Sequence, residues 1–259
     1  MTLAPTTPAP TIEEIVAADP RALGRAITLV ERGDHRMAPV LAEARRRGGR
    51  AFRVGFTGAP GVGKSSLLRE VTRRLRAAGA RVAVVASDPV SPITGGALLG
   101  DRCRMADSAS EDGVFFRSVA HRSEGSGLSA AASGAADLLD ASGFSWILVE
   151  TVGTGQADSA ALRGASLKVL VHTPDSGDEV QMLKAGIVET ADLHVVTKCD
   201  RPGARAWASE LEATLGQGPS GRGRVFPVSS VTGEGVDELV AELIEVFKRS
   251  RDGAGNVKS

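Results

Sequence analysis

Residues 58–65 read GAPGVGKS and fit the pattern G-x-x-x-x-G-K-[ST]. Its glycines let the backbone curl where a side chain would clash, and the curl points several N–H groups into a concavity that suits phosphate oxygens. The helix that follows adds partial positive charge at its N-terminus. In this pattern Lys64 reaches the β- and γ-phosphates, and Ser65 offers its hydroxyl to Mg²⁺. The motif therefore predicts a site for the phosphates of a nucleotide.

The flanking residues supply the context that the motif requires. AFRVGFT (51–57) reads as a buried strand, and SLLREVTRRLRAAG (66–79) has apolar residues at helical spacing. Gly79 is placed to end that helix. Strand, glycine-rich loop and helix in this order favour a phosphate loop over a ligand-free turn.

From residue 51 onward, short apolar runs alternate with helical patterns. Strands are predicted near 51–57, 81–87, 113–119, 144–150, 167–172, 192–197 and 224–228. Helices are predicted near 65–78, 127–141, 179–188, 203–215 and 235–249. This alternation predicts an α/β fold with a mostly parallel, doubly wound sheet, whose ligands bind at the carboxyl ends of the strands.

The chain of 259 residues is predicted to have three parts. Residues 1–50 form a disordered, Pro/Thr/Ala-rich tip and a helical appendage. The amphipathic faces of the appendage are expected to pack on the main domain, with a partner-binding role as the alternative. Residues 51–250 form the main domain, and 251–259 a disordered tail.

Charge and composition restrict the function. The 31 basic and 31 acidic residues balance, so nucleic acid and anionic membrane are not expected as main partners. Aromatic residues make up 3% and tyrosine is absent, which again argues against binding of single-stranded nucleic acid. Cys103 and Cys199 have no metal-type spacing, and neither a signal peptide nor a membrane-spanning run is present. We expect a cytoplasmic protein.

Acidic residues follow two of the predicted strands. Asp88 opens a long loop, 88–112, that also contains Asp101, and both acids could bind Mg²⁺ directly or through water. Glu150 ends the strand FSWILVE, where a further metal-supporting acid belongs. Gly153 could place its N–H against the γ-phosphate, and Gln156 could orient a water, although a surface glutamine is an equal alternative. A turn or cap aspartate is the alternative for Asp88 and for Asp101.

The segment Thr197-Lys198-Cys199-Asp200 is close to the N-K-x-D motif that reads guanine in GTPases, with threonine in place of asparagine. Asp200 would accept hydrogen bonds from the N1–H and the exocyclic amine of guanine, and adenine has neither donor in that place. Lys198 would lay its stem along the base. Ser229 and Ser230 suit the loop whose backbone meets the guanine carbonyl.

The candidate site residues thus fall into three sets. The catalytic set is Lys64, Asp101, Glu150 and Gln156. The metal set is Ser65, Asp88, Asp101 and Glu150. The nucleotide-binding set is Gly58, Ala59, Pro60, Gly61, Val62, Gly63, Lys64, Ser65, Ser66, Gly153, Thr197, Lys198, Asp200, Ser229 and Ser230.

The chain resembles the MeaB/ArgK-type GTPases, the chaperones associated with methylmalonyl-CoA mutase. The resemblance covers about residues 19–249. Its motifs are RAITLVE (25–31), GAPGVGKSSL (58–67), SDPVSPITGGALLGDRCRM (87–105), ETVGTGQAD (150–158), GDEVQMLKAGIVETAD (177–192) and TKCD (197–200).

The resemblance implies a P-loop GTPase fold and a Mg²⁺-dependent GTPase that assists an adenosylcobalamin-dependent acyl-CoA mutase, by gating cofactor delivery and by protecting or rescuing the mutase. It implies switch segments at 88–105, 150–158 and 175–188, the last with Lys184. Members of the family continue into a C-terminal helical arm that forms their dimer. The printed chain ends soon after Arg249, which leaves a family-type homodimer open.

We expect slow turnover that the mutase partner raises, because no pre-placed base or arginine finger is obvious; Arg102 and Arg104 read as surface residues. One alternative is a GTPase that delivers nickel or zinc. It would need ligands for its cargo, and the histidines His35, His121, His172 and His194 read as isolated. The other alternative is a small-molecule kinase, for which no acceptor pocket is evident.

Overall fold

A computed structural model describes residues 8–89, 112–121, 130–151, 164–174, 190–216 and 224–255. It contains a seven-stranded sheet in the order β3-β2-β4-β1-β5-β6-β7. The strands are β1 (Phe52–Thr57), β2 (Val82–Pro89), β3 (Val114–His121), β4 (Trp146–Glu150), β5 (Leu167–His172), β6 (Leu193–Val196) and β7 (Val225–Pro227). Every pairing between neighbouring strands is parallel, which confirms the predicted fold class.

The helices of the described part are α1 (Ile12–Val16), α2 (Pro20–Glu31), α3 (Met37–Arg47), α4 (Lys64–Ala77), α6 (Ala130–Ala141), α10 (Ala204–Gly216) and α11 (Val236–Gly255). Two of these helices begin with side-chain caps. The Thr11 hydroxyl and the Glu14 carboxylate form a capping box at α1, and Asp19 caps α2 ahead of Pro20. The helix predicted near 179–188 lies outside the described residues.

The C-terminal helix is longer than predicted. It was expected to end near residue 249, but α11 continues to Gly255, so residues 251–255 are helical rather than part of a disordered tail. Ion pairs along the surface of α11 join Lys248 to Glu245 and Arg249 to Glu242.

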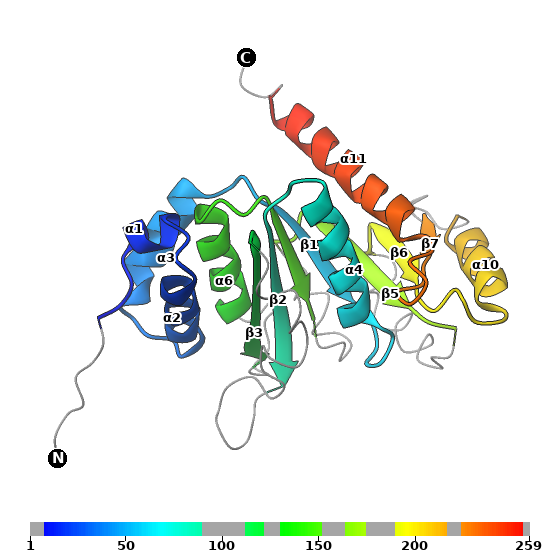
Figure 1. The fold of residues 1–259 in the computed structure, drawn as a ribbon, viewed down its shortest axis with the longest axis horizontal. Coiled ribbons are helices and arrows are strands. Elements are labelled where there is room, and N and C mark those ends of the chain that lie inside the picture. The colour runs from blue at the N-terminus through cyan, green and yellow to red at the C-terminus, as the bar shows by residue number, and fades with distance from the viewer. Residues whose placement is uncertain are drawn as a thin grey trace.

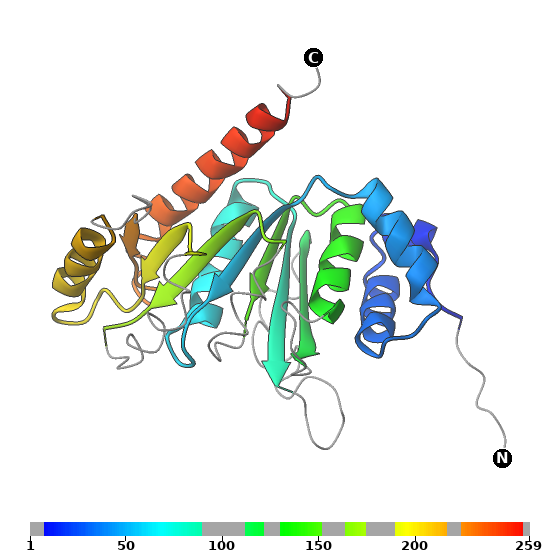
Figure 2. The same ribbon diagram turned by 180° about the vertical axis from the view of Figure 1, so that it is seen from behind.

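Two hydrophobic cores lie on opposite faces of the sheet, because alternate residues of a strand point to opposite sides. In β2, Val82, Val84 and Ala86 belong to the core under α4 and α11, whereas Ala83 and Val85 belong to the core under α6. In Figure 1, α4 and α11 lie in front of the sheet, and in Figure 2 the strands lie in front of α4. The sheet is therefore covered on both faces, which explains why its strands read as continuous apolar runs.

The appendage α1–α3 lies beside α6 at one end of the molecule (Figure 1) and shares its core, with Leu23 and Ile27 fully buried. A polar network joins the appendage to β1. The Asp140 carboxylate of α6 accepts the N–H groups of residues 49–51 at 2.8–3.1 Å, together with the Arg53 guanidinium at 3.1 Å. Burial of Asp140 opposes its ionisation, yet these donors leave its pKa below the usual range. The linker between appendage and sheet is thus held in place.

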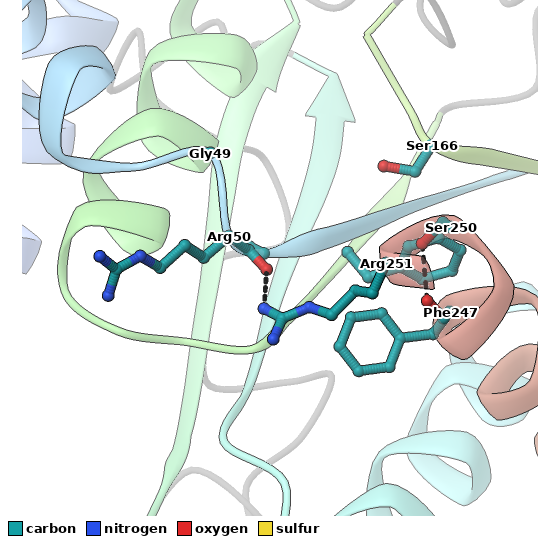
Figure 3. Close-up of a pocket in the computed structure, with 8 residues that line it drawn as sticks. Gly49, Arg50, Ser166, Phe247, Ser250 and Arg251 are labelled. Atoms are coloured by element: carbon teal, nitrogen blue, oxygen red, sulfur yellow. Dashed lines mark hydrogen bonds between the residues drawn. The ribbon is translucent and has the colours of Figure 1, made fainter. Parts of the chain in front are cut away.

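A groove of about 720 Å³ lies where β1 begins, at the edge of the sheet opposite the phosphate loop. Figure 3 shows α11 closing one side of it. The Arg251 guanidinium lies 5.0 Å from the centre of the Phe247 ring and donates to the Arg50 carbonyl at 3.0 Å. The Arg50 side chain points away from this contact (Figure 3). The groove therefore lies where α11 is attached to the start of β1, and it is remote from the predicted nucleotide site.

Candidate functional site

The phosphate loop has the backbone that its glycines predict. Gly58, Gly61 and Gly63 have φ of 145°, 78° and 98°, and Gly63 caps α4. A Cβ on Gly58 would lie 2.2 Å from the carbonyl oxygen of Val171 in β5. Only glycine allows the chain to leave β1 this close to the neighbouring strand, and this contact fixes the start of the loop.

The Lys64 side chain is folded over the loop. Its Nζ donates to the carbonyl oxygens of Gly58 at 2.6 Å and of Ala59 at 3.0 Å, and the residue is buried. Pro60 and Gly61 at the tip are exposed, whereas Val62 packs into the core. The ammonium group is consequently held within the loop, at the N-terminus of α4, where anionic oxygens are favoured.

Ser65 and Glu150 meet across the sheet. The Ser65 hydroxyl donates to Glu150 Oε1 at 2.8 Å, because β1 and β4 are neighbours and both end at this edge. Beside them the hydroxyl of Thr151 donates to that of Thr57 at 3.0 Å, an arrangement that the sequence did not predict. A hydroxyl and a carboxylate oxygen at this separation are hard ligands of the kind that Mg²⁺ prefers, so the residues present fit that ion.

Thr197 contacts the phosphate loop directly. Its buried hydroxyl lies 2.5 Å from the Val62 carbonyl oxygen and 2.9 Å from the His172 carbonyl oxygen. One hydroxyl proton serves two acceptors, whereas the amide of an asparagine would carry two protons. Lys198 has a left-handed φ of 57°, and its Nζ donates to the Gly61 carbonyl at 3.3 Å. The segment 197–200 and the phosphate loop thus form one structural unit.

Asp200 is exposed and lies beside the loop after β7. A hydrogen bond from Ser229 is the main cause that lowers the pKa of its carboxyl group, so the group is ionised at neutral pH. Ser229 is fully buried, and its Oγ also accepts the N–H groups of Val231 at 3.3 Å and Thr232 at 3.2 Å. Asp200 therefore presents a fixed negative charge, and Ser230 follows in the same turn.

His172 and His194 are a buried pair, which corrects the prediction that the histidines are isolated. His172 Nε2 lies 3.0 Å from His194 Nδ1, and the rings stack at an interplanar angle of 20°. Burial lowers the pKa of His172 to about 3, with a contribution from His194, and that of His194 to about 4. Their positions on β5 and β6, which pair directly, were the signal in the sequence that could have revealed this contact.

Several predicted site residues lie outside the described residues. They are Asp101, Gly153, Gln156, Arg102, Arg104 and Lys184, with most of the segments 88–105, 150–158 and 175–188. Asp88 is described by its backbone, which lies one residue before the end of β2, opposite Ala120 of β3. Ser66 is exposed on the first turn of α4. The structure therefore brings together the phosphate loop, Glu150, 197–200 and Ser229 at one edge of the sheet.

Comparison with known proteins agrees with this geometry. The family model described as "Methylmalonyl Co-A mutase-associated GTPase MeaB" matches residues 23–259. The chain belongs to the MeaB family of GTPases. A relative from Pyrococcus horikoshii, named "Putative GTPase PH0274", is 41% identical over 252 residues, covering 95% of this chain and 79% of the relative.

Two further similarities support membership of the MeaB family. "GTPase ArgK" of Escherichia coli strain K12 is 33% identical over 217 residues, which cover 81% of this chain and 65% of that protein. A solved structure described as "LAO/AO transport system kinase" is 26% identical, with a TM-score of 0.72, and the match covers 94% of this chain and 76% of that one. As a MeaB-family GTPase, the protein hydrolyses GTP to GDP and phosphate.

Proposed function

We propose that this GTPase is a nucleotide-switched chaperone of an adenosylcobalamin-dependent acyl-CoA mutase. The observation that carries the proposal is the match of residues 23–259 to the mutase-associated MeaB family, together with a complete phosphate loop and an Asp200 side chain beside it. We treat residues 1–50 as an appendage to a GTPase domain at 51–250. Within the described residues, no helix is long and apolar enough to cross a membrane.

The phosphates of GTP would bind in the concavity of residues 58–65. Lys64 would carry its charge to the β- and γ-phosphates, and its position over the loop, against the Gly58 and Ala59 carbonyls, supports this role. When GTP binds, the ammonium would exchange these carbonyl contacts for phosphate oxygens and would stabilise charge that develops during in-line attack of water.

Ser65 and Glu150 would hold Mg²⁺, with Asp88 and Asp101 in support, some of them through water. When bound, Mg²⁺ supplies positive charge next to the β- and γ-phosphates. The 2.8 Å contact between Ser65 and Glu150 supports this assignment, since it places two hard oxygens at the N-terminus of α4. We propose that Gly153 and Gln156 belong to the γ-phosphate side of the site.

The base would be read by Asp200. An ionised carboxylate fixed by Ser229 matches the N1–H and exocyclic amine of guanine, and adenine would leave it desolvated without donors. The contact of Thr197 with the Val62 carbonyl supports a base site that is continuous with the phosphate loop.

Replacement of Asp200 tests this reading. In Asp200→Ala we expect calorimetry with Mg²⁺ to show GDP affinity reduced by at least about 10-fold, with ADP affinity unchanged, because only guanine loses two charge-assisted hydrogen bonds. Asp192→Ala is the control, because Asp192 precedes β6 whereas Asp200 follows it, at the other end of that strand. If the wild type bound GDP and ADP equally and the substitution changed neither affinity, residues 197–200 would form a turn with no role in base recognition.

The chaperone role is tested by turnover with a mutase. We expect phosphate release at saturating GTP to rise several-fold when the mutase is added, because loss of the γ-phosphate would be coupled to a switch that the partner contacts. A catalytically intact GTPase with the same turnover in the presence and absence of mutase would contradict this role.

The two alternatives from the sequence are less well supported. For a metal-delivery role, the described residues contain no group of three or more His, Cys, Asp or Glu side chains that could hold a metal ion. In the buried histidine pair, His172 Nε2 faces His194 Nδ1, and the pair supplies two ligands where a structural zinc site takes four. The kinase alternative predicts that labelled γ-phosphate passes from GTP to an acceptor molecule, whereas a GTPase releases it as free phosphate.

A further inference from the structure

The side chain of Arg74 joins α4 to the loop that follows β7. Arg74 lies in the last turn of α4, and its side chain is 12% exposed. Helical side chains lean toward the N-terminus of their helix. The Arg74 guanidinium accordingly contacts Glu70 one turn earlier, where Nη1 donates to Oε2 at 2.6 Å. Its other donors are directed out of α4, toward α11 and the loop that precedes it.

Three acceptors hold the guanidinium of Arg74. Besides the contact with Glu70, Nε donates to the Asp237 carboxylate in the first turn of α11, and Nη2 donates to the Gly233 carbonyl oxygen at 3.2 Å. Gly233 has a left-handed φ of 82°, and a Cβ there would lie 3.1 Å from Nη2, so glycine leaves room for this approach. A guanidinium can supply three nitrogens to separate acceptors at once, whereas a lysine ammonium has one.

Two hydrogen bonds connect Gly233 to Asp200, the carboxylate that is proposed to read the base. The Gly233 N–H donates to the Ser229 carbonyl at 2.9 Å, and the Ser229 hydroxyl donates to Asp200. The same hydroxyl oxygen accepts the N–H groups of Val231 and Thr232. Because these backbone donors occupy its acceptor side, its proton is left for Asp200. The hydrogen bond to Asp200 therefore depends on the conformation of this loop.

The N-terminal end of α4 carries the phosphate-binding groups, since Lys64 and Ser65 begin the helix. In addition, α4 and α11 lie on the same face of the sheet and share one hydrophobic core (Figure 1). One helix thus holds the phosphate loop at one end and, through Arg74, the loop after β7 at the other. A bound nucleotide would occupy both sites, so the distance between them has to match its length.

We infer that Arg74 is a positioning residue, which ties the loop after β7 to α4 and thereby holds the Ser229 hydroxyl against Asp200. This inference rests on the proposed guanine site at Asp200 and adds to it the group that sets the distance of that site from the phosphate loop. Arg74 acts through the Gly233 backbone and Ser229, without touching the nucleotide. Its loss should lower the affinity for guanine nucleotides and leave the chemical step unchanged.

Calorimetry with GDP and with ADP, in the presence of Mg²⁺, tests the inference on the full chain. In Arg74→Met we expect GDP to bind about 3- to 10-fold more weakly, because Asp200 loses a fixed donor, and ADP to bind unchanged. Arg74→Lys should behave in the same way, since one ammonium cannot reach all three acceptors. In GTP turnover, both variants should raise KM by a similar factor and leave kcat unchanged.

Arg73→Met is the matched control for the loss of an arginine beside Glu70. Arg73 pairs with Glu70 at 3.1 Å, but its side chain is 63% exposed, and among the described residues it makes no hydrogen bond or ion pair with the loop after β7. This variant should bind GDP like the wild type. A double-mutant cycle then identifies the route of the effect, because Arg74→Met should weaken GDP binding no further once Asp200 is alanine.

The outcomes separate the inference from the proposed function. If Asp200→Ala abolishes GDP preference while Arg74→Met or Arg74→Lys binds GDP like Arg73→Met, the guanidinium does not position the base site and the inference fails alone. The inference also fails if Arg74→Met weakens ADP as much as GDP, or if its full effect persists in the Asp200→Ala background. If Asp200→Ala leaves GDP preference intact, both the guanine site and the role of Arg74 are wrong.

Discussion

Gly58→Ala should cost about 3 kcal/mol of folding free energy or more and should abolish measurable GDP binding. The new Cβ would lie 2.2 Å from the Val171 carbonyl oxygen, and φ at this position is 145°, which a side chain rarely adopts. Val171 lies in β5, a central strand whose backbone cannot move without breaking its ladders to β1 and β6. The start of the phosphate loop would therefore have to shift.

Two other glycines provide matched controls for this variant. Gly61 has φ of 78° with open space around its Cβ position, so Gly61→Ala reports the backbone strain alone. Gly24, inside α2, has open space and no positive φ, so Gly24→Ala should be neutral or stabilise by up to about 1 kcal/mol. Urea unfolding and GDP calorimetry measure both effects. A Gly58→Ala variant as stable as Gly61→Ala, with normal GDP affinity, would show that the loop is not fixed by β5.

Acid should destabilise the protein through the buried pair His172 and His194. Their pKa values in the folded protein are about 3 and about 4, below the usual value of 6.5. Between the folded values and pH 6.5, the unfolded chain therefore binds more protons than the folded protein. The contribution of the neutral pair to the free energy of unfolding is fully present above pH 6.5, and it is lost as the pH falls toward the pKa values of the folded protein. Each histidine contributes a slope on the order of 1 kcal/mol per pH unit, or about 4 kcal/mol for the pair between pH 7 and 5.

Unfolding measured at several pH values checks this expectation. The double variant His172→Gln/His194→Gln should lose the slope between pH 6.5 and 5, whereas His35→Gln, at an exposed histidine, should retain it. Where the double variant does not fold, NMR titration of the wild type is decisive, because the two buried rings should stay neutral down to pH 5. Either ring becoming protonated near pH 6.5 in the folded protein would refute the prediction.

The acid effect should extend to nucleotide binding. The His172 carbonyl accepts both the N–H and the hydroxyl of Thr197, and Thr197 also reaches the Val62 carbonyl in the phosphate loop. Protonation of the pair would push apart two stacked rings directly beneath this junction. The stability of the core and the geometry of the nucleotide site are thus coupled through one carbonyl group.

Sequence patterns predicted which helices and strands exist better than they predicted the residues at which these elements end. Short continuous apolar runs between helical patterns located all seven strands, since a parallel sheet covered on both faces requires such runs. The end of α11 was placed too early, near residue 249, whereas the helix continues to Gly255 and carries Phe247 and Arg251 against the start of β1. Asp140 gave no sequence signal, since its partners are backbone N–H groups about 90 residues away.

The sequence by itself determined the phosphate loop, because a run of glycines followed by Lys64 and Ser65 prescribes a local backbone conformation. Only the tertiary structure decided which distant groups meet that loop. Ser65 contacts Glu150 across 85 positions, and Thr197 contacts Val62 across 135. These contacts exist because β4 and β5 flank β1 and β6 flanks β5, and this strand order is set by long-range packing that no local pattern encodes.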